Sequence, residues 1–174
     1  MSLKGLCAPG ALVRNDTVHL FYQTYGNGAK DAVCHAWSED GIHFVRNATK
    51  SYFFSGKGSG IAGVPSMRRS FFLRISIYLY YATRTPDYST QVIGVAMAPA
   101  HTDFSKQAWK SRESSVLVPS ILGKRSVSKE HLVVQMGDEM FMFYAGAYNN
   151  RPQQIGVAKS SDGITGQNFL INPF

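Results

Sequence analysis

The chain has 174 residues, of which 18 are Lys or Arg and 11 are Asp or Glu, so its formal net charge is +7. Hydrophobic residues make up 44% of the sequence and aromatic residues 13%, which is enough to bury a core and excludes intrinsic disorder. No apolar run approaches the roughly 18 residues of a membrane span, and the first residues lack the apolar stretch of a signal peptide. We therefore expect no membrane partner, and the sequence leaves the cellular compartment open.

An internal repeat organises the chain. Three strand-like segments share a pattern of aromatic and β-branched residues that ends in a tyrosine, namely Tyr22, Tyr81 and Tyr144. These tyrosines lie 59 and 63 residues apart, and 14 or 15 residues after each comes a second shared segment with a central alanine. Two motifs that recur three times in the same register indicate a repeat of about 60 residues. Because the tyrosines recur, we interpret them as packing residues.

In chain order, each repeat is expected to begin with two strands joined by a hairpin. The hairpin turns are predicted at 14–17 and 136–139, where Asn, Asp and Gly follow an apolar stretch. After the third strand, Asp-Gly at 40–41 and 162–163 predicts a tight turn into a fourth strand. The middle repeat is irregular, because 67–76 has no comparable hairpin turn. This order predicts four-stranded antiparallel blades, which form a β-propeller when they repeat radially.

The repeat resembles the blades of five-bladed β-propellers in glycoside hydrolase families 43 and 32. The motifs that carry the resemblance lie at 19–23, 34–44, 142–150 and 154–164. The resemblance implies an all-β fold with three four-stranded antiparallel blades in one β-propeller-like domain, 1–174, with blades at approximately 6–60, 61–126 and 127–174. Since five such blades need about 300 residues, we expect a partial propeller, either a truncated reading frame or a fragment that assembles.

The resemblance also implies cleavage of glycosidic bonds in oligo- or polysaccharides, which needs one carboxyl group as acid and another as base or nucleophile. Most of the eleven carboxyl groups fall in expected turns, where they accept backbone hydrogen bonds. Those left as catalytic candidates are Asp31, Asp87 and Glu130. In the resembled families the catalytic carboxylates stand at the start of the first strand of a blade. Glu130 matches the general-acid position, just ahead of the apolar stretch 132–134.

The other two blades lack a carboxylate at the corresponding place. The first has Ala8 beside Pro9, and the second has Val64 beside Pro65. Asp31 or Asp87 would then have to act as the base, unless another chain supplies it. The alternative hypothesis is a propeller that binds carbohydrate without cleaving it, or a vestigial one.

Candidate ligand-binding residues lie mainly on the connections between the second and third strands of each blade. These connections share one end of the blade with the start of its first strand. Tyrosine rings can cover the apolar C–H surface of a sugar, while amides and a guanidinium pair with its hydroxyls. Ordinary polar surface loops are the alternative, and for His35 a core position. The candidates are Gln23, Tyr25, His35, Tyr148, Asn149, Arg151 and Gln153.

The cysteines, the positive charge and the open blade faces indicate which metals, cofactors and macromolecular partners to expect. Cys7 and Cys34 lack the clustered ligands of a zinc site, so we expect half-buried thiols, no metal site and no cofactor. The basic surplus is diffuse, and since blade packing accounts for the aromatic residues, we predict no nucleic-acid partner. Three blades leave two open blade faces, which predicts self-association or companion blades.

Overall fold

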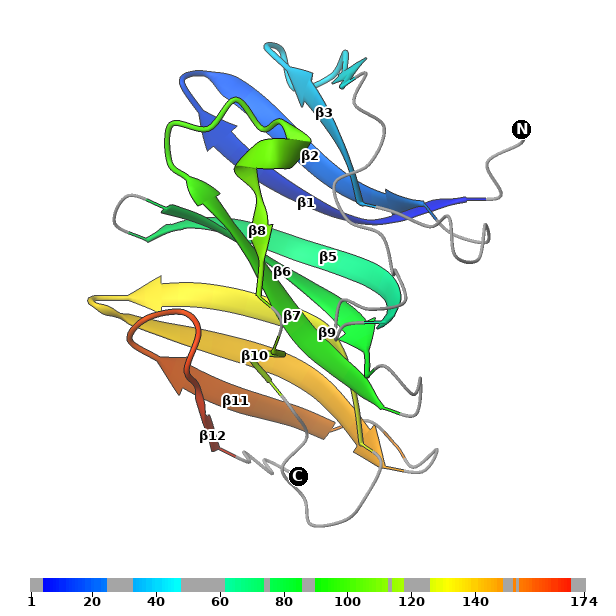
Figure 1. Ribbon diagram of the computed structural model, residues 1–174, viewed down its shortest axis with the longest axis vertical. Coiled ribbons are helices and arrows are strands. Elements are labelled where there is room, and N and C mark those ends of the chain that lie inside the picture. The colour runs from blue at the N-terminus through cyan, green and yellow to red at the C-terminus, as the bar shows by residue number, and fades with distance from the viewer. Residues whose placement is uncertain are drawn as a thin grey trace.

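The computed structural model describes residues 5–24, 33–47, 62–73, 76–85, 90–112, 114–117, 126–148, 152 and 154–169. Within these residues the regular structure is β-strand, apart from the single 3-10 turn η2 (Lys106–Ala108). The strands form three four-stranded antiparallel sheets, which follow one another along the long axis of the molecule (Figure 1). The predicted all-β fold of propeller blades is confirmed.

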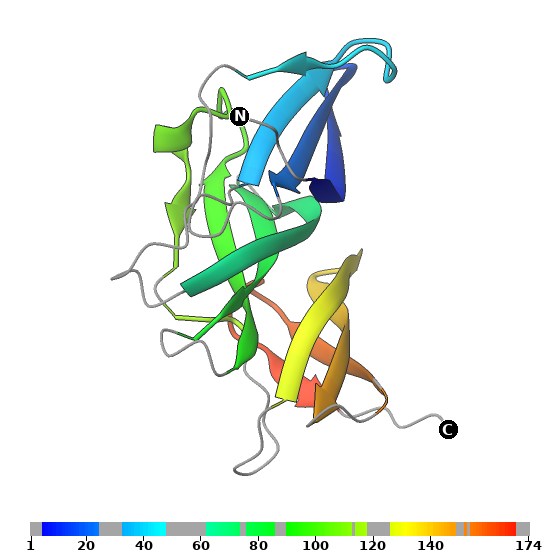
Figure 2. The ribbon, with the colours of Figure 1, turned by 90° about the vertical axis from the view of Figure 1, so that its right-hand side faces the viewer.

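Each sheet keeps its strands in chain order. The first sheet contains β1 (Leu6–Arg14), β2 (Thr17–Thr24), β3 (Val33–Ser38) and β4 (Val45–Arg46). The second contains β5 (Ala62–Leu73), β6 (Ser76–Arg84), β7 (Gln91–Pro99) and β8 (Lys110–Ser111). The third contains β9 (Ser126–Met136), β10 (Glu139–Tyr148), β11 (Gln154–Ser160) and β12 (Gln167–Phe169). The first strands β1, β5 and β9 contact one another in sequence, as innermost strands of adjacent blades do (Figure 2).

The two expected hairpin turns form where the sequence predicts them. Asn15 and Asp16, with φ of 49° and 58°, connect β1 to β2. Gly137, with φ of 60°, stands in the turn between β9 and β10. Positive φ in a two-residue turn matches the right-handed twist of the strands that it joins. Local sequence therefore determines both turns.

The two Asp-Gly turns use the same hydrogen bonds. Asp162 Oδ1 accepts from Ser160 Oγ at 2.8 Å and from the N–H groups of Ile164 and Thr165 at 2.7 Å each. In the first sheet, Asp40 Oδ1 accepts from Ser38 Oγ and from the N–H groups of Ile42 and His43. Burial alone would raise the pKa of Asp162, but these donors lower it to about 2. Both carboxylates hold backbone in place, as predicted.

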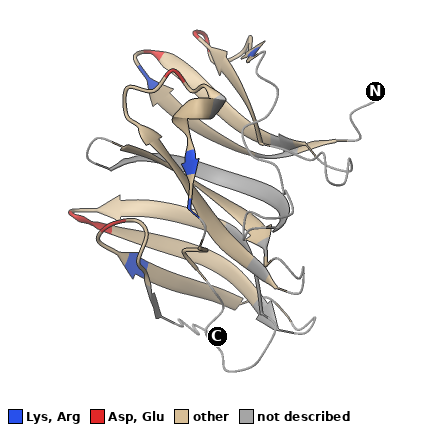
Figure 3. Cartoon of the chain, in the orientation of Figure 1, with Lys and Arg blue, Asp and Glu red and all other residues tan. Residues whose placement is uncertain are grey.

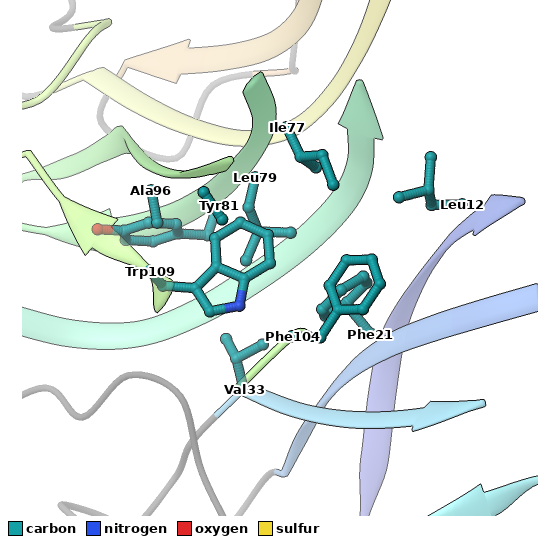
Figure 4. Close-up of a cluster of buried hydrophobic side chains, with 10 residues drawn as sticks. Leu12, Phe21, Val33, Ile77, Leu79, Tyr81, Ala96, Phe104 and Trp109 are labelled. Carbon is teal, nitrogen blue, oxygen red and sulfur yellow. The ribbon is translucent and has the colours of Figure 1, made fainter. Parts of the chain in front are cut away.

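Two apolar clusters lie between neighbouring sheets. Phe21 of β2 is fully buried and meets Trp109 edge-on, with ring centroids 5.6 Å apart. The first cluster, between the first and second sheets (Figure 4), consists of Leu12, Phe21, Val33, Ile77, Leu79, Tyr81, Ala96, Ala98, Phe104 and Trp109. The second, between the second and third sheets, consists of Tyr78, Tyr80, Ile93, Val95, Leu117, Val133, Met140, Met142 and Ala158.

The repeated tyrosines pack against glycine, which confirms their structural role. Tyr81 pairs across the strands with Gly94, and a Cβ on Gly94 would lie 2.8 Å from the tyrosine ring. Gly156 stands in the same relation to Tyr144, at 2.3 Å. A side chain at either glycine would therefore displace the ring that covers it.

Cys34 stands where the other two sheets have this glycine, opposite Tyr22. It is buried rather than half-buried, and burial raises the pKa of its thiol. The side chain of Cys7 lies outside the described part of the chain. Among the described residues, no group of three or more His, Cys, Asp or Glu could hold a metal ion. Nor does the described part contain a helix with the length and hydropathy to cross a membrane.

Candidate functional site

The candidate site lies at one end of the three sheets. In each antiparallel blade, the connections from strand one to two and from strand three to four lie at one end. The start of the innermost strand and the connection from strand two to three therefore share the other end (Figure 1). We call this second end the open end. It carries the starts of β1, β5 and β9.

Most carboxyl groups lie at the end opposite the open end. Asp103, for example, accepts a hydrogen bond from the Ser105 N–H at 2.9 Å in the connection from β7 to β8. Figure 3 shows these acidic segments in the turns of all three sheets. The residues are Asp16, Glu39, Asp40, Asp103, Asp138, Glu139 and Asp162. They are therefore removed from the place where Glu130, Asp31 and Asp87 are expected to act.

Glu130 lies in a break of the strand register near the open end. Together with the residue before it, Glu130 stands opposite the single residue Ala145 of β10. In β1 the same kind of break places Ala8 and Pro9 opposite Tyr22. Such β-bulges re-aim side chains and are common next to active sites. The backbone position of Glu130 is thus suited to presenting a side chain.

The innermost strand of the second sheet has its own irregularity at the open end. Residues 63–65 stand opposite Thr83, and a further shift follows between Met67 and Arg69. All three innermost strands therefore lose regular pairing close to the repeated tyrosine. Among the residues at these breaks, Glu130 is the one that carries a carboxylate.

For some of the predicted site residues the structure describes only the backbone, and others lie outside the described residues. Gln23 and Tyr148 lie at or next to the last residues of β2 and β10, which places their backbone at the open end. The residues outside the described part are Asp31, Asp87, Tyr25, Asn149, Arg151 and Gln153. Their roles, and that of the Glu130 side chain, stay predictions.

The connection that contains Asp87 is closed by hydrogen bonds at its base. The Thr85 N–H donates to the Thr90 carbonyl at 2.9 Å, and the Thr90 N–H donates to Thr85 Oγ1 at 3.1 Å. Both threonines therefore anchor the connection from β6 to β7 at the open end. Asp87 lies midway between them in the sequence.

His35 lies in the core rather than at the surface of the open end. Its side chain is 4% exposed, and its ring lies 4.9 Å from that of Phe21 and 5.2 Å from that of Phe104, between centroids. His35 Nε2 and His19 Nδ1 lie 3.1 Å apart and form a hydrogen bond in which one ring donates and the other accepts. Burial lowers the pKa of each imidazole to about 4. A sugar could touch His35 only if the first two sheets separated.

His131 lies next to the candidate acid Glu130, and the sequence predicts no role for it. It follows Glu130 in β9, is 3% exposed, and pairs across the strands with Tyr144. Its ring meets Tyr80 edge-on, with centroids 6.5 Å apart. The available signal was a histidine at the head of the apolar stretch 132–134, directly beside the candidate acid. Its burial anchors the strand next to the Glu130 bulge.

Comparison with known proteins supports the fold. No family model matches the chain, and no curated protein matches its sequence. A family 117 glycoside hydrolase from Zobellia galactanivorans aligns with a TM-score of 0.74 and 16% identity, over 97% of this chain and 56% of that one. A family 32 β-fructofuranosidase from Bombyx mori aligns at 0.70 and 14%, over 95% and 35%. A β-1,2-mannobiose phosphorylase from Listeria innocua aligns at 0.68 and 11%, over 95% and 59%.

These likenesses show the fold of the β-propeller glycoside hydrolases and their relatives. This confirms the resemblance that the blade motifs indicate. The chain spans between 35% and 59% of the length of the three solved chains. A variant of the Bombyx mori enzyme was solved with sucrose. Because one fold hosts several chemistries, the reaction must be argued from the site.

Proposed function

We propose that this chain is a glycoside-hydrolase-like protein that acts on glycosidic bonds of oligo- or polysaccharides. The observation that carries the proposal is the position of Glu130 in the bulge of β9, at the open end. The fold shared with glycoside hydrolases supports the same assignment.

In this proposal Glu130 is the general acid and gives its proton to the oxygen of the leaving sugar. Partial burial would keep the carboxyl protonated until then. Asp31 or Asp87 would act as the base that takes a proton from the attacking water, or as the nucleophile. Tyrosine rings and the amides at the open end would hold the sugar.

The test is hydrolysis of aryl glycosides and plant polysaccharides by wild type and Glu130→Gln. Loss of the general acid should lower turnover by about 10²–10⁴-fold. Glu139→Gln is the matched control, because Glu139 lies in the far turn and pairs with Lys159 at 2.6 Å. Equal turnover by wild type and Glu130→Gln would remove Glu130 from the mechanism.

Carbohydrate binding without cleavage is the second candidate function. It is favoured by the breaks in β1 and β5, where Ala8–Pro9 and residues 63–65 carry no carboxylate. Calorimetric titration with oligosaccharides should then show binding that releases no reducing ends. Arg151→Ala would weaken that binding, whereas Glu130→Gln would leave it unchanged. Cleavage by wild type would exclude this candidate.

We also propose that the chain associates with other blades. The outer sides of the first and third sheets carry exposed apolar residues, among them Leu6 at 59% and Ile155 at 57% exposure. Soluble proteins rarely leave such faces uncovered. This part of the proposal does not depend on the reaction.

A further inference from the structure

The fold separates the charges of this chain between its two ends. We call the end opposite the open end the turn end, because it carries the connections from strand one to two and from strand three to four. Seven of the eleven carboxyl groups lie in these turns. Five Lys or Arg belong to the same connections or to the strand ends beside them, namely Arg14, Arg74, Lys106, Lys110 and Lys159. The turn end is therefore slightly acidic, although the chain as a whole is basic.

Two of the cations at the turn end are already bound to other groups of the protein. Lys159 Nζ lies 2.6 Å from Glu139 Oε1. Arg14 donates to the Ala100 carbonyl at 2.9 Å, and its guanidinium lies 4.2 Å from the centroid of the Phe104 ring. Since carboxylates outnumber cations here, and two of the cations are engaged, this end should repel a polyanion.

The basic surplus gathers toward the open end. Outside the turn end the chain has thirteen Lys or Arg and four carboxyl groups. Eight of these cations, but only three of the carboxyl groups, precede β1 or belong to segments that connect strands at the open end, which are 25–32, 47–61, 85–90, 112–125 and 149–153. Most residues of these segments lie outside the described part, so their end of the molecule follows from the strands that they connect.

A cation also accompanies each candidate catalytic carboxyl group, within three residues along the chain. The pairs are Lys30 with Asp31, Arg84 with Asp87, and Lys129 with Glu130. Two of these cations have a described backbone. Lys129 stands together with Glu130 opposite Ala145 in the bulge of β9. Arg84 ends β6 and pairs with Ala62, the first residue of β5. Cations thus recur in all three blades beside the residues proposed to act on the saccharide.

A neutral saccharide has no group that calls for these cations. Its hydroxyls pair with amides and carbonyl groups as well as with charged side chains. A carboxylate or sulfate on a sugar instead forms charge-assisted hydrogen bonds with Lys and Arg, which are about twice as strong as neutral ones. A molecule with one positive and one acidic end also attracts a polyanion to the positive end.

We infer that the saccharide of the proposed function is acidic, with carboxylate or sulfate groups on its sugars, and that it binds at the open end. Arg84 and Lys129 pair with these anionic groups on either side of the bond that is acted on. The inference rests on the proposed function, which places a saccharide at this end, and it adds the chemical class of that saccharide.

The test compares polymers that have the same backbone and differ in charge. Calorimetric titration of the full chain should show that polygalacturonate binds at least about tenfold more tightly than its methyl-esterified form. Dextran sulfate and dextran are the second pair, and the pair with the larger difference identifies carboxylate or sulfate as the recognised group. Equal affinities within both pairs would overturn the inference.

Charge-removing variants locate the binding. Arg84→Gln and Lys129→Gln should each reduce the preference for the acidic polymer by about tenfold. Lys110→Gln is the matched control, because it removes the same charge from an exposed residue that pairs with Met97 near the turn end. Arg84→Lys and Lys129→Arg keep the charge and should keep the preference, which separates lost charge from a disturbed strand. An equal loss in Lys110→Gln would show that overall charge attracts the polymer, and would overturn the inference.

Two further outcomes separate this inference from its alternatives. Oligothymidylate is a polyanion of another class, and binding as tight as that of the preferred acidic polysaccharide would overturn the inference. No preference for acidic polymers, with turnover still lost in Glu130→Gln, would overturn this inference and leave the proposed reaction intact. A clear preference for them, with turnover unaffected by Glu130→Gln, would remove the proposed reaction and leave this inference standing.

Discussion

The pair formed by His19 and His35 sits inside an aromatic cluster with a cation at its edge. The Arg14 guanidinium lies 4.2 Å from the Phe104 ring centroid and donates to the Ala100 carbonyl at 2.9 Å. The Asn47 amide lies 3.4 Å from His35 Nδ1. A proton on either imidazole would place a buried cation near the partly buried guanidinium of Arg14. The fold therefore keeps the pair neutral.

This neutrality predicts that acid destabilises the protein. The pKa of each histidine is lowered from 6.5 to about 4 by burial, so the unfolded chain binds protons before the native chain does. The free energy of unfolding should be highest above pH 6.5 and fall as the pH drops toward 4, by about 3 kcal/mol for one histidine. Urea unfolding between pH 4 and 7.5 measures it.

The matched variant for this experiment is His19→Gln combined with His35→Gln. Glutamine preserves a polar side chain but does not titrate in this range. The variant should have a flatter pH dependence than wild type. An unchanged slope would show that other groups control acid stability.

Gly94 must be a glycine because the ring of Tyr81 occupies the space that a side chain would need. Tyr81 is 3% exposed, so its ring has little room to retreat from a Cβ placed 2.8 Å away. Gly94→Ala should lower the free energy of unfolding by about 1–3 kcal/mol. Chemical denaturation checks it, with Gly166→Ala as control, because a Cβ there meets its nearest atom at 3.7 Å. Similar stabilities for the two variants would contradict the tight packing.

At the scale of elements, one hydroxyl links the second sheet to a turn of the third. Tyr80→Phe removes the hydrogen bond to the Gly163 carbonyl and should cost about 1–3 kcal/mol, since the buried acceptor loses its donor. Tyr78→Phe in the same strand is the matched control, because no described residue bonds its hydroxyl. Thermal melts of both variants decide the matter. An equal loss from the control would indicate a general effect of the tyrosine ring.

The elements that the sequence predicts correctly are those determined by local chemistry. The Asn15–Asp16 hairpin and the Asp162–Gly163 turn depend on residues that favour positive φ or accept nearby N–H groups. The turn of the middle sheet is different. Phe104 takes a φ of 58°, unusual for a bulky residue, with its N–H held by Thr102 Oγ1 at 3.0 Å and its ring buried between sheets. Such a turn depends on tertiary packing that sequence pattern does not contain.

The candidate site also has features that the sequence predicts and features that it does not. The resemblance to propeller blades predicts Glu130 at the start of the first strand of its blade, whereas β9 begins at Ser126 and Glu130 is its fifth residue. The bulge around it arises from register between two strands, which a single sequence does not display. The burial of His131 and His35 likewise depends on contacts with neighbouring sheets. The sequence thus predicts that Glu130 belongs to the first strand of its blade, but not where that strand begins or which side chains are buried.

At the scale of the whole molecule, the stacked sheets make stability depend on what covers the two outer faces. If copies of the chain associate through these faces, as the proposed association with other blades allows, folding is coupled to association, and the melting temperature should rise with protein concentration by about 2 °C per tenfold increase. Calorimetry at several concentrations measures this. The melting temperature of Ile155→Glu should not change with concentration. A wild-type melting temperature independent of concentration would contradict coupled association.

The bulges in the innermost strands shift position from blade to blade. Counted from the repeated tyrosine, the break faces Tyr22 itself in β1 and the next residue, Ala145, in β9. In β5 one break faces Thr83, two residues on, and a second lies between Met67 and Arg69, beside Tyr81. Each extra residue moves the side chains that follow it to the opposite face of the sheet, and the two extra residues at 63–65 therefore cancel. Distance along the chain from the tyrosine therefore does not identify which residues of the innermost strands share a face of the sheet. A sequence alignment of such blades that is anchored on the outer strands will therefore pair residues of the innermost strands that are not structurally equivalent. The alternation of side chains in each innermost strand must be counted from the bulge of that strand.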